Sequence, residues 1–525
     1  MKARHVDPVL VQVARRRIRT GAALLVGMAI LSPAPAATIP DELRPLHVLN
    51  RLAYGPAPGD LETVRTMGVD KYIESQLAPS SIPQPEGLSQ DLNGLETLHL
   101  DPERLFEEYG PPRPERGQPP DPEAIKAARE RARVILLQAV EARLWRAVRS
   151  PRQLEEVMTD FWYNHFNVFA DKGLDHLWIG AYEEEAIRPY VLGRFRDLLG
   201  ATAHHPAMLF YLDNWQNTAP GSPGARGRFE GLNENYAREL MELHTLGVDG
   251  GYTQQDVIAL ARILTGWGLG RPRGGGDRGG FYFDPKRHDY GNKTFLGHLI
   301  RGRGADEGEQ ALDILARAPA TAHHIGYELA QYFVADDPPP ELVQRLARRF
   351  LDTDGDIRAV LGALFHSPEF WDQKYNGNKF KTPYQYLVSA VRASGQSPVN
   401  VRPLRGMLTQ LGMPPYACLT PDGYPNTREA WLNPDAMMRR VSFATALANG
   451  RLPLARPAED DAGTMPKQTG RAERAPMTPI EPLDAARLAD TLGNEWSSPT
   501  RAALAQTPPR LRAALILGSP EFMQH

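Results

Sequence analysis

The stretch that decides the fold reads GLNENYARELMELHTLGVDGGYTQQDVIALARILTGWGL and runs from Gly231 to Leu269. Its apolar residues recur at helical spacing in two segments, which predicts two helices joined by a tight glycine turn. Asn233 is expected to cap the first helix, and Gly247 supplies a left-handed residue near its end. Thr253, with Asp256 three residues later, is a capping-box variant that begins the second helix. Local chemistry alone therefore predicts both helix starts and the turn between them.

The first of these helices carries its polar side chains on one face. At 100° per residue, Asn235, Arg238, Glu239 and Glu242 fall within an arc of roughly 100°. One interpretation is a solvated surface on which Glu234 and Arg238 pair at i,i+4. The other is a buried polar face, on which the two carboxylates bind a metal ion or share a proton while the amide and the guanidinium orient them.

Length and composition limit the classes of protein to consider. The 525 residues suffice for two or more ordinary domains or for one large helical body. A balance of 60 basic against 63 acidic residues gives a net charge of −3, which does not favour nucleic acid or an anionic membrane as a partner. Cys418 is the single cysteine, so an intrachain disulfide and a cysteine-rich zinc site are excluded.

The N-terminus has the pattern of an export signal over residues 1–36. Basic residues between Arg15 and Arg19 precede an apolar core from Gly21 to Leu31 and then a small-residue cleavage site. We expect cleavage after Ala36 and a periplasmic or secreted protein spanning residues 37–525. The alternative, an uncleaved membrane anchor, is disfavoured because an apolar core of eleven residues is too short to cross a bilayer.

Beyond these segments the chain alternates helical patterns with loops. A long amphipathic helix is expected over 124–148, and an aromatic-rich segment over 154–169 contains Asn164 and His165. The histidine is either a satisfied core residue or, given its polar neighbours, a functional one. Two short strands at 281–283 and 293–295 are expected to form one β-hairpin.

The predicted fold class is therefore mostly α, a single large multi-helix body with one short β-hairpin. The 47 prolines and 46 glycines indicate many short helices with long connecting loops. The loop inserts are expected at about 79–122, 216–231, 270–280 and 453–479. The run DTDGDIRAV from Asp352 lacks the register of a calcium loop, so Asp354 or Asp356 is interpreted as a helix cap.

Five phrases carry a resemblance to a known family. They are FWYNHFNV, AMLFYLDN, LNENYARELMELHTLGVDGGYTQQDVIALARILTGW, RHDYGNKTFLG and KTPYQYLVSAVRA. In this order they resemble the bacterial family called domain of unknown function 1800, over roughly Leu43 to Phe522. The resemblance implies a mostly helical exported protein, often encoded beside a partner that looks like the sulfatase and alkaline-phosphatase superfamily. It implies no particular reaction.

The resemblance also implies which polar residues recur in the family. In this chain they fall on Asn164, His165, Asp213, Asn214, Asn233, Glu234, Asn235, Arg238, Glu239, Glu242, His244, Thr265, Trp267, His288 and Lys293. The chain departs from the family mainly in long inserts near Pro111, Arg271 and Pro457. These inserts affect the roles of loops more than the centre of the chain.

The first functional hypothesis is an exported hydrolase with a Glu/His site on the 233–247 helix. The residues assigned to catalysis are Glu239, Glu242, His165 and Arg238, the last to hold an anionic substrate group. Those assigned to substrate binding are Asn164, Asn235, His288 and Lys293. The expected cofactor, a divalent metal ion, would be held by Glu239, Glu242 and His165.

Two alternatives stay open. The same polar residues could form a structural network in a noncatalytic scaffold, or a binding partner of an exported sulfatase-like or phosphatase-like protein. A haem protein with His165 or His244 as an axial ligand is the third hypothesis. No nucleophile elbow, HExxH or P-loop motif is present in the sequence, so residue types alone support the reaction class.

Overall fold

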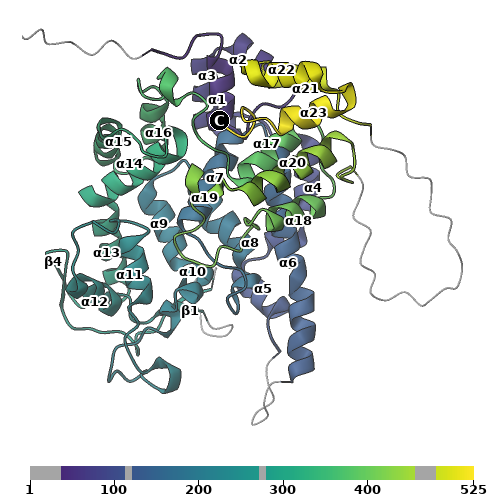
Figure 1. Ribbon diagram of the computed structural model, residues 1–525. Helices are drawn as coiled ribbons and strands as arrows, with labels where there is room; N and C mark the ends of the chain where they lie inside the picture. Colours follow the sequence, from purple (N-terminus) through teal and green to yellow (C-terminus); the bar gives the residue numbers. More distant parts are fainter. Residues whose placement is uncertain (1–36, 113–120, 271–279, 456–480) are drawn as a thin grey trace, which may run out of the picture. The chain divides into compact units, whose positions relative to one another are not determined.

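Helices make up most of the chain, as the sequence predicts. The computed structural model describes residues 37–112, 121–270, 280–455 and 481–525 (Figure 1). The α-helices of the N-terminal half are α1 (Arg44–Leu52), α2 (Asp60–Met67), α3 (Val69–Leu77), α4 (Glu86–Asn93), α5 (Pro102–Tyr109), α6 (Pro122–Arg149), α7 (Gln153–His165), α8 (Ile179–Ala181), α9 (Phe195–His204), α10 (Pro206–Tyr211), α11 (Asn235–Glu242) and α12 (Gln254–Ile263). A π-helix, η4 (Tyr182–Ile187), directly follows α8.

The C-terminal half continues with eleven α-helices in the part of the chain that is described. They are α13 (Asp306–Ala316), α14 (Pro319–Phe333), α15 (Pro340–Asp352), α16 (Ile357–Phe365), α17 (Pro383–Ser394), α18 (Arg402–Gln410), α19 (Arg428–Trp431), α20 (Pro434–Ala448), α21 (Ala485–Thr491), α22 (Ser498–Gln506) and α23 (Pro509–Leu517). None of the described helices combines the length and the apolar character that a membrane crossing requires.

Several helix ends follow from local sequence chemistry. Thr253 and Asp256 form the predicted reciprocal capping box at α12, and Gly247 adopts a φ of +83°. Asp356 caps α16 by accepting the backbone N–H of Ala359 at 2.9 Å. Helix α11 begins at Asn235, two residues after the predicted cap. Asn233 instead accepts the backbone N–H of Asn235 at 3.0 Å and forms an Asx turn before the helix.

The predicted single β-hairpin is wrong in its pairing. The strands β2 (Phe281–Phe283) and β3 (Lys293–Phe295) lie where the sequence predicts them, but in separate antiparallel sheets. Strand β2 pairs with β1 (Trp267–Leu269), and β3 pairs with β4 (His298–Ile300). The tight turn is made by Leu296 and Gly297, both at positive φ, which suits the two-residue turns of hairpins.

The described part of the segment predicted as a loop over 79–122, residues 79–112, contains helices. It contains α4 and α5, whose side chains Leu88 and Leu105 are fully buried. Asp101 caps α5 by accepting the N–H of Arg104, and Pro102 occupies the first helical position. A high proline content therefore marks helix starts here rather than a loop.

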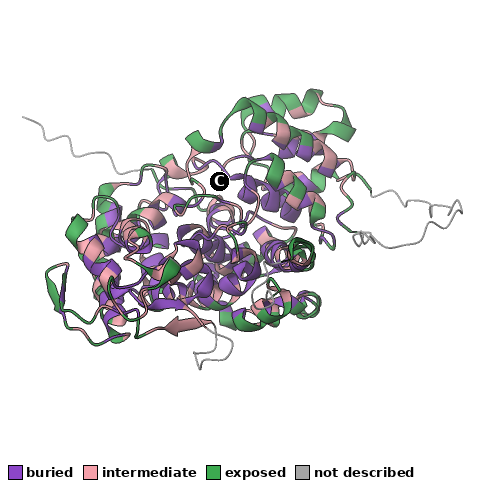
Figure 2. Cartoon of the chain, turned by 90° about the horizontal axis from the view of Figure 1, so that it is seen from below, coloured by how far each residue is buried: buried purple, intermediate pink, exposed green. Residues whose placement is uncertain are grey.

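The polar site described below is positioned by α7, which packs against α1, α3, α6 and η4. Helix α14 packs on α15, and α15 packs on α16. In the C-terminal part, α23 packs against α20 and α21. Figure 2 shows buried residues gathered where the helices face one another and exposed residues on their outer sides. This pattern is that of amphipathic helices around a shared apolar core.

The proposed signal peptide, residues 1–36, lies outside the described residues. So do most of the loop inserts expected at 270–280 and 453–479. The insert expected at 216–231 is described and consists of turns and one short 3-10 helix. Residues 37–525 form one compact unit.

Candidate functional site

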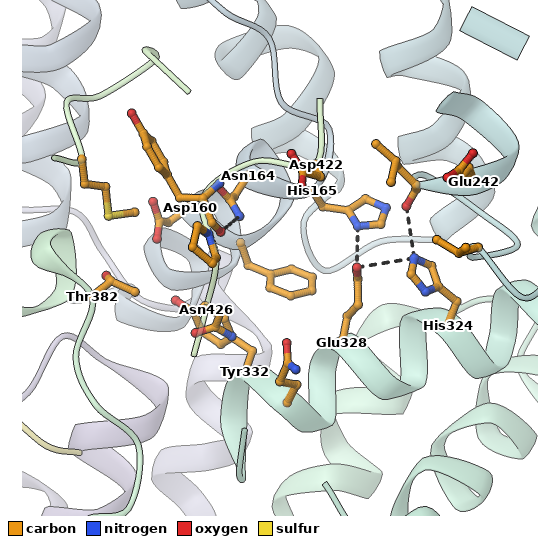
Figure 3. A pocket seen from close by; sticks show the side chains of 17 residues that line it. Asp160, Asn164, His165, Glu242, His324, Glu328, Tyr332, Thr382, Asp422 and Asn426 are labelled. Carbon is orange, nitrogen blue, oxygen red and sulfur yellow. Dashed lines mark hydrogen bonds and ion pairs between the residues drawn. The ribbon is translucent and has the colours of Figure 1, made fainter. Parts of the chain in front are cut away.

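A pocket of about 220 Å³ lies at the C-terminal end of α7 (Figure 3). Its walls come from α7, the end of α11, the middle of α14 and the connection between α18 and α19. The polar residues that line it are Asp160, Asn164, His165, Glu242, His324, Glu328, Gln331, Tyr332, Thr382, Asp422, Tyr424 and Asn426. Segments more than 250 residues apart in the sequence therefore meet at one cavity.

His165 is the last residue of α7, and both of its ring nitrogens face oxygen atoms. Nδ1 lies 2.7 Å from a carboxylate oxygen of Glu328, and Nε2 lies 3.2 Å from the backbone carbonyl of His244. Neither oxygen can donate a proton while Glu328 is ionised. An imidazole satisfies two acceptors only when both nitrogens carry hydrogen. The geometry therefore fits an imidazolium paired with a carboxylate.

Glu328 lies between two imidazoles on the wall formed by α14. Its second oxygen is 3.4 Å from Nε2 of His324, one helical turn earlier on the same helix, and Figure 3 shows the carboxylate reaching both rings. Burial by itself raises the pKa of Glu328, but the neighbouring His165 and His324 outweigh it and hold the pKa below its usual value. Glu328 lines the pocket, and its side chain is 29% exposed.

A histidine behind these two stays neutral. His244 is fully buried, and burial together with the nearby His165 and His324 holds its pKa well below the usual value. The ring centres of His165 and His244 are 6.0 Å apart. Through its backbone carbonyl, His244 fixes the orientation of the His165 ring.

Two further carboxylates line the pocket. Glu242, the last residue of α11, is half-buried and accepts a hydrogen bond of 3.2 Å from the hydroxyl of Tyr252. Asp422 is exposed on the connection between α18 and α19. Burial raises the pKa of the adjacent Glu239, and the Glu242 and Asp422 carboxylates add to this rise. Negative charge is therefore concentrated on this side of the pocket.

The charge of Asp160, deeper in the pocket, is compensated. Its carboxylate is 2.5 Å from the guanidinium of Arg143, which also contacts Glu183 at 2.8 Å. Glu183 lies in the π-helix η4 and accepts a hydrogen bond from the hydroxyl of Tyr416. Interruptions of this kind in a helix occur often beside functional sites. This buried network fixes α6, α7 and η4 behind the pocket.

Asn164 attaches the α18–α19 connection to α7. Its amide nitrogen donates to the carbonyl of Tyr424 at 2.9 Å, and its amide oxygen accepts the backbone N–H of Tyr424 at 2.7 Å. These two bonds hold the wall that carries Asp422 and Asn426. Of the residues predicted for the site, the structure brings Asn164, His165 and Glu242 together.

Other predicted site residues lie elsewhere. Arg238 donates to Glu234 at 3.3 Å and to Gln254 at 3.0 Å, so the i,i+4 surface pair is confirmed and the guanidinium does not line the pocket. Asn235 is exposed and donates to the carbonyl of Leu212. Glu239 is half-exposed and lies beside the pocket rather than in its wall.

His288 and Lys293 belong to a separate buried network. The His288 ring is 2.9 Å from one oxygen of Glu307, and the Lys293 amine is 2.5 Å from the other. Glu307 also accepts the backbone N–H groups of Arg303 and Gly304. All three side chains are almost completely enclosed, so His288 and Lys293 cannot reach a substrate in this arrangement.

The expected metal site is not formed. Among the described residues, no group of three or more His, Cys, Asp or Glu is arranged to hold a metal ion, and Glu239, Glu242 and His165 do not form one. A metal-bound imidazole needs a nitrogen without hydrogen. Both nitrogens of His165 face other partners. The same geometry opposes the haem hypothesis for His165.

Sequence reasoning missed Glu328 and His324. Their contacts with His165 and with the end of α11 join residues that lie far apart in the chain, so spacing within one segment could not reveal them. A signal was present nevertheless. His324, Glu328 and Gln331 recur at i, i+4 and i+7 and are half-buried on a helix whose buried positions are mostly apolar or small, which marks a polar stripe.

Comparison with known proteins identifies the family of the chain but assigns no reaction to it. The chain matches the family model described as "Protein of unknown function (DUF1800)" over residues 47–524. No curated protein and no solved structure matches the chain. Because the match covers nearly the whole chain, the protein belongs to the DUF1800 family.

Proposed function

We propose that the protein is a hydrolase whose active site is the pocket around His165. The observation that carries the proposal is the Glu328–His165 pair. The His165 imidazole, held by a carboxylate and a backbone carbonyl at the edge of a cavity, is placed to give a proton to a leaving group. This proposal takes the hydrolase hypothesis forward without the metal ion.

The remaining groups fit an acid–base mechanism. Glu242 is a half-buried carboxylate of the same pocket and acts as the general base, removing a proton from water. The hydroxide adds to the electrophilic centre, the scissile bond breaks, and the proton from His165 goes to the departing group. Glu328 and His324 are positioning residues, since they hold His165 and its proton in place.

Activity screening of the purified mature chain, residues 37–525, tests this proposal. Chromogenic carboxylic, phosphate and sulfate esters and glycosides are supplied as separate panels. One class should be hydrolysed, and both His165→Gln and Glu242→Gln should lower kcat/KM by about 100-fold or more, the usual contribution of a general acid or base. Failure to hydrolyse any class, or unchanged rates in both variants, would contradict the proposal.

A matched control is available in the same protein. His204 and Glu309 form a similar pair, 2.8 Å apart, which does not line the pocket. Glu309→Gln should therefore keep the wild-type kcat/KM. A loss of activity equal to that of Glu242→Gln would show that the variants act through general stability.

The proposal places this chemistry outside the cytoplasm, with cleavage after Ala36. The support is the N-terminal charge and hydropathy pattern. Mass spectrometry of the protein from the periplasmic fraction should find a chain beginning at Ala37. A chain that retains residues 1–36 would overturn this part of the proposal.

One observation favours the alternative, a noncatalytic partner of an exported sulfatase-like or phosphatase-like protein. Met438 and Val441, one turn apart on α20, are 72% and 47% exposed, and Leu432 lies close before the helix with 49% exposed. Exposed apolar groups of this kind occur at protein interfaces. Met438→Glu with Val441→Glu should abolish co-elution with the neighbouring-gene protein in size-exclusion chromatography. Unchanged co-elution, or none in the wild type, would remove this alternative.

A further inference from the structure

The ionisable groups of the His165 pocket are unevenly distributed. Among the described residues that line it there is no Lys or Arg, whereas Asp160, Glu242, Glu328 and Asp422 are all carboxylates. Two of these charges are compensated, because Asp160 contacts Arg143 and Glu328 contacts His165. The pocket therefore keeps two carboxylates, Glu242 and Asp422, to which no lining cation is paired.

Arg238 is close enough to Glu239 to lower the pKa of that carboxyl, but it does not line the pocket, and its hydrogen bonds go to Glu234 and Gln254. Glu239 adds a third acidic group beside Glu242. Ionised carboxylates that lie close together repel one another. A cation placed among them relieves this repulsion.

The apolar lining gives a second, independent indication. Phe161, Tyr332 and Tyr424 contribute aromatic rings to the same cavity. Aromatic faces attract organic cations through their quadrupole, and pockets that combine them with carboxylates recognise ammonium groups. A volume of about 220 Å³ is below the roughly 300–1,000 Å³ of pockets for drug-sized ligands. It suits one small group of a larger substrate.

We infer that the pocket receives a positively charged group, of the amine class, with Glu242 and Asp422 facing the cation. This inference rests on the proposed function only in taking the pocket as the substrate site. It also reverses the role expected for the site from Arg238, which was the binding of an anionic group. Anionic substrates would meet two uncompensated carboxylates, and the His165 imidazolium of the lining is already paired with Glu328.

Charged thiol reagents test the inference without knowledge of the substrate. Val248 lines the pocket and is 68% exposed, so a Val248→Cys variant offers a reporter thiol at its edge. The background carries Cys418→Ser, which removes the single native cysteine. Two methanethiosulfonate reagents are compared, one with a trimethylammonium group and one with a sulfonate group. Because both react with the same thiolate, their rate ratio reports the local potential.

Met438→Cys in the same background is the control, since Met438 is similarly exposed but lies on α20 away from the pocket lining. At low ionic strength the cationic-to-anionic rate ratio at the pocket should exceed that of the control by about tenfold, within the range of electrostatic focusing in clefts. Adding Glu242→Gln and Asp422→Asn should bring the ratio to the control value. A pocket ratio equal to or below the control overturns the inference. The labelling rates do not depend on catalysis, so this test can succeed or fail independently of the hydrolysis test.

Discussion

Two of the histidine–glutamate pairs among the described residues are similar in length but lie in different surroundings. In the His288–Glu307 pair, 2.9 Å apart, the carboxylate also binds Lys293 and two backbone N–H groups, and both side chains are enclosed. In the His165–Glu328 pair, 2.7 Å apart, the carboxylate reaches a second imidazole and faces a cavity. The same residue types thus form a network that is enclosed in one region, the closed region, and one that lines a pocket in the other, the open region.

The difference teaches how to assign a role to such a pair. A buried carboxylate whose lone pairs are all used stabilises the fold and has no capacity left for a ligand. A pair at the wall of a cavity keeps part of that capacity, and its charge can act on a bound molecule. The residues predicted for substrate binding, His288 and Lys293, fall in the first region, whereas Asn164 and His165 fall in the second.

The largest expected effect is on stability in the closed region. Glu307→Gln leaves the buried Lys293 amine without its carboxylate, and breaking a buried ion pair in this way typically costs about 3–5 kcal/mol. Urea unfolding monitored by circular dichroism measures the loss. Glu328→Gln, in the open region, should cost about 1.5–3 kcal/mol, the usual range for a lost hydrogen bond to a charged group. If Glu328→Gln proves the more costly, the contrast between the two regions fails.

The sequence predicts the local part of this architecture well. The capping box of Thr253 and the Asp356 cap of α16 depend on residues within one turn, so they can be predicted from the sequence. The pairing of β2 with β1 and of β3 with β4 could not be predicted in this way, because the spacing of β2 and β3 in the chain also fits a hairpin between those two strands.

The candidate site divides in the same way. The sequence identifies His165 and Asn164 as site candidates because they lie together in an aromatic-rich segment. It identifies Glu242 because this residue shares a helical face with Glu239. Glu328 gains its role only because α14 packs beside the end of α7, which is a long-range contact. Helical spacing also could not predict whether Arg238 is exposed, because a polar helical face can turn either toward solvent or toward the core.

The next effect concerns the wall of the pocket. Asn164→Ala removes both hydrogen bonds to Tyr424 and should lower the free energy of unfolding by about 1–3 kcal/mol. It should also release the connection that carries Asp422, which hydrogen exchange of residues 421–426 would detect as faster labelling. Exchange as slow as in the wild type would show that this wall is held by other contacts.

A smaller effect is expected on the dependence of stability on pH. His204 and Arg196 outweigh the opposing effect of burial and lower the pKa of Glu309 to about 2. A lowered carboxyl pKa stabilises the folded state above the ordinary value near 4.5, and this contribution is lost as pH falls from 4.5 towards 2. Glu309→Gln should therefore flatten the unfolding free energy over that window. An unchanged slope would contradict the assignment.

The smallest effect is expected at Arg238, which the sequence analysis assigned to bind an anionic group and which forms a surface ion pair. Arg238→Ala removes an exposed ion pair with Glu234, which is typically worth less than about 1 kcal/mol. Thermal unfolding should change little, and any hydrolysis by the protein should be retained. A loss of activity comparable to that of Glu242→Gln would return Arg238 to the site.

The protonation of His165 tests the central claim most directly. Nitrogen-15 NMR of the histidine side chains distinguishes an imidazolium, with hydrogen on both nitrogens, from a neutral ring with one bare nitrogen. Because both nitrogens face acceptors, the wild-type spectrum should show hydrogen on both nitrogens of His165, and Glu328→Gln should leave one nitrogen bare. A neutral His165 in the wild type, unaltered by Glu328→Gln, would contradict the account of the pocket as an acid–base site.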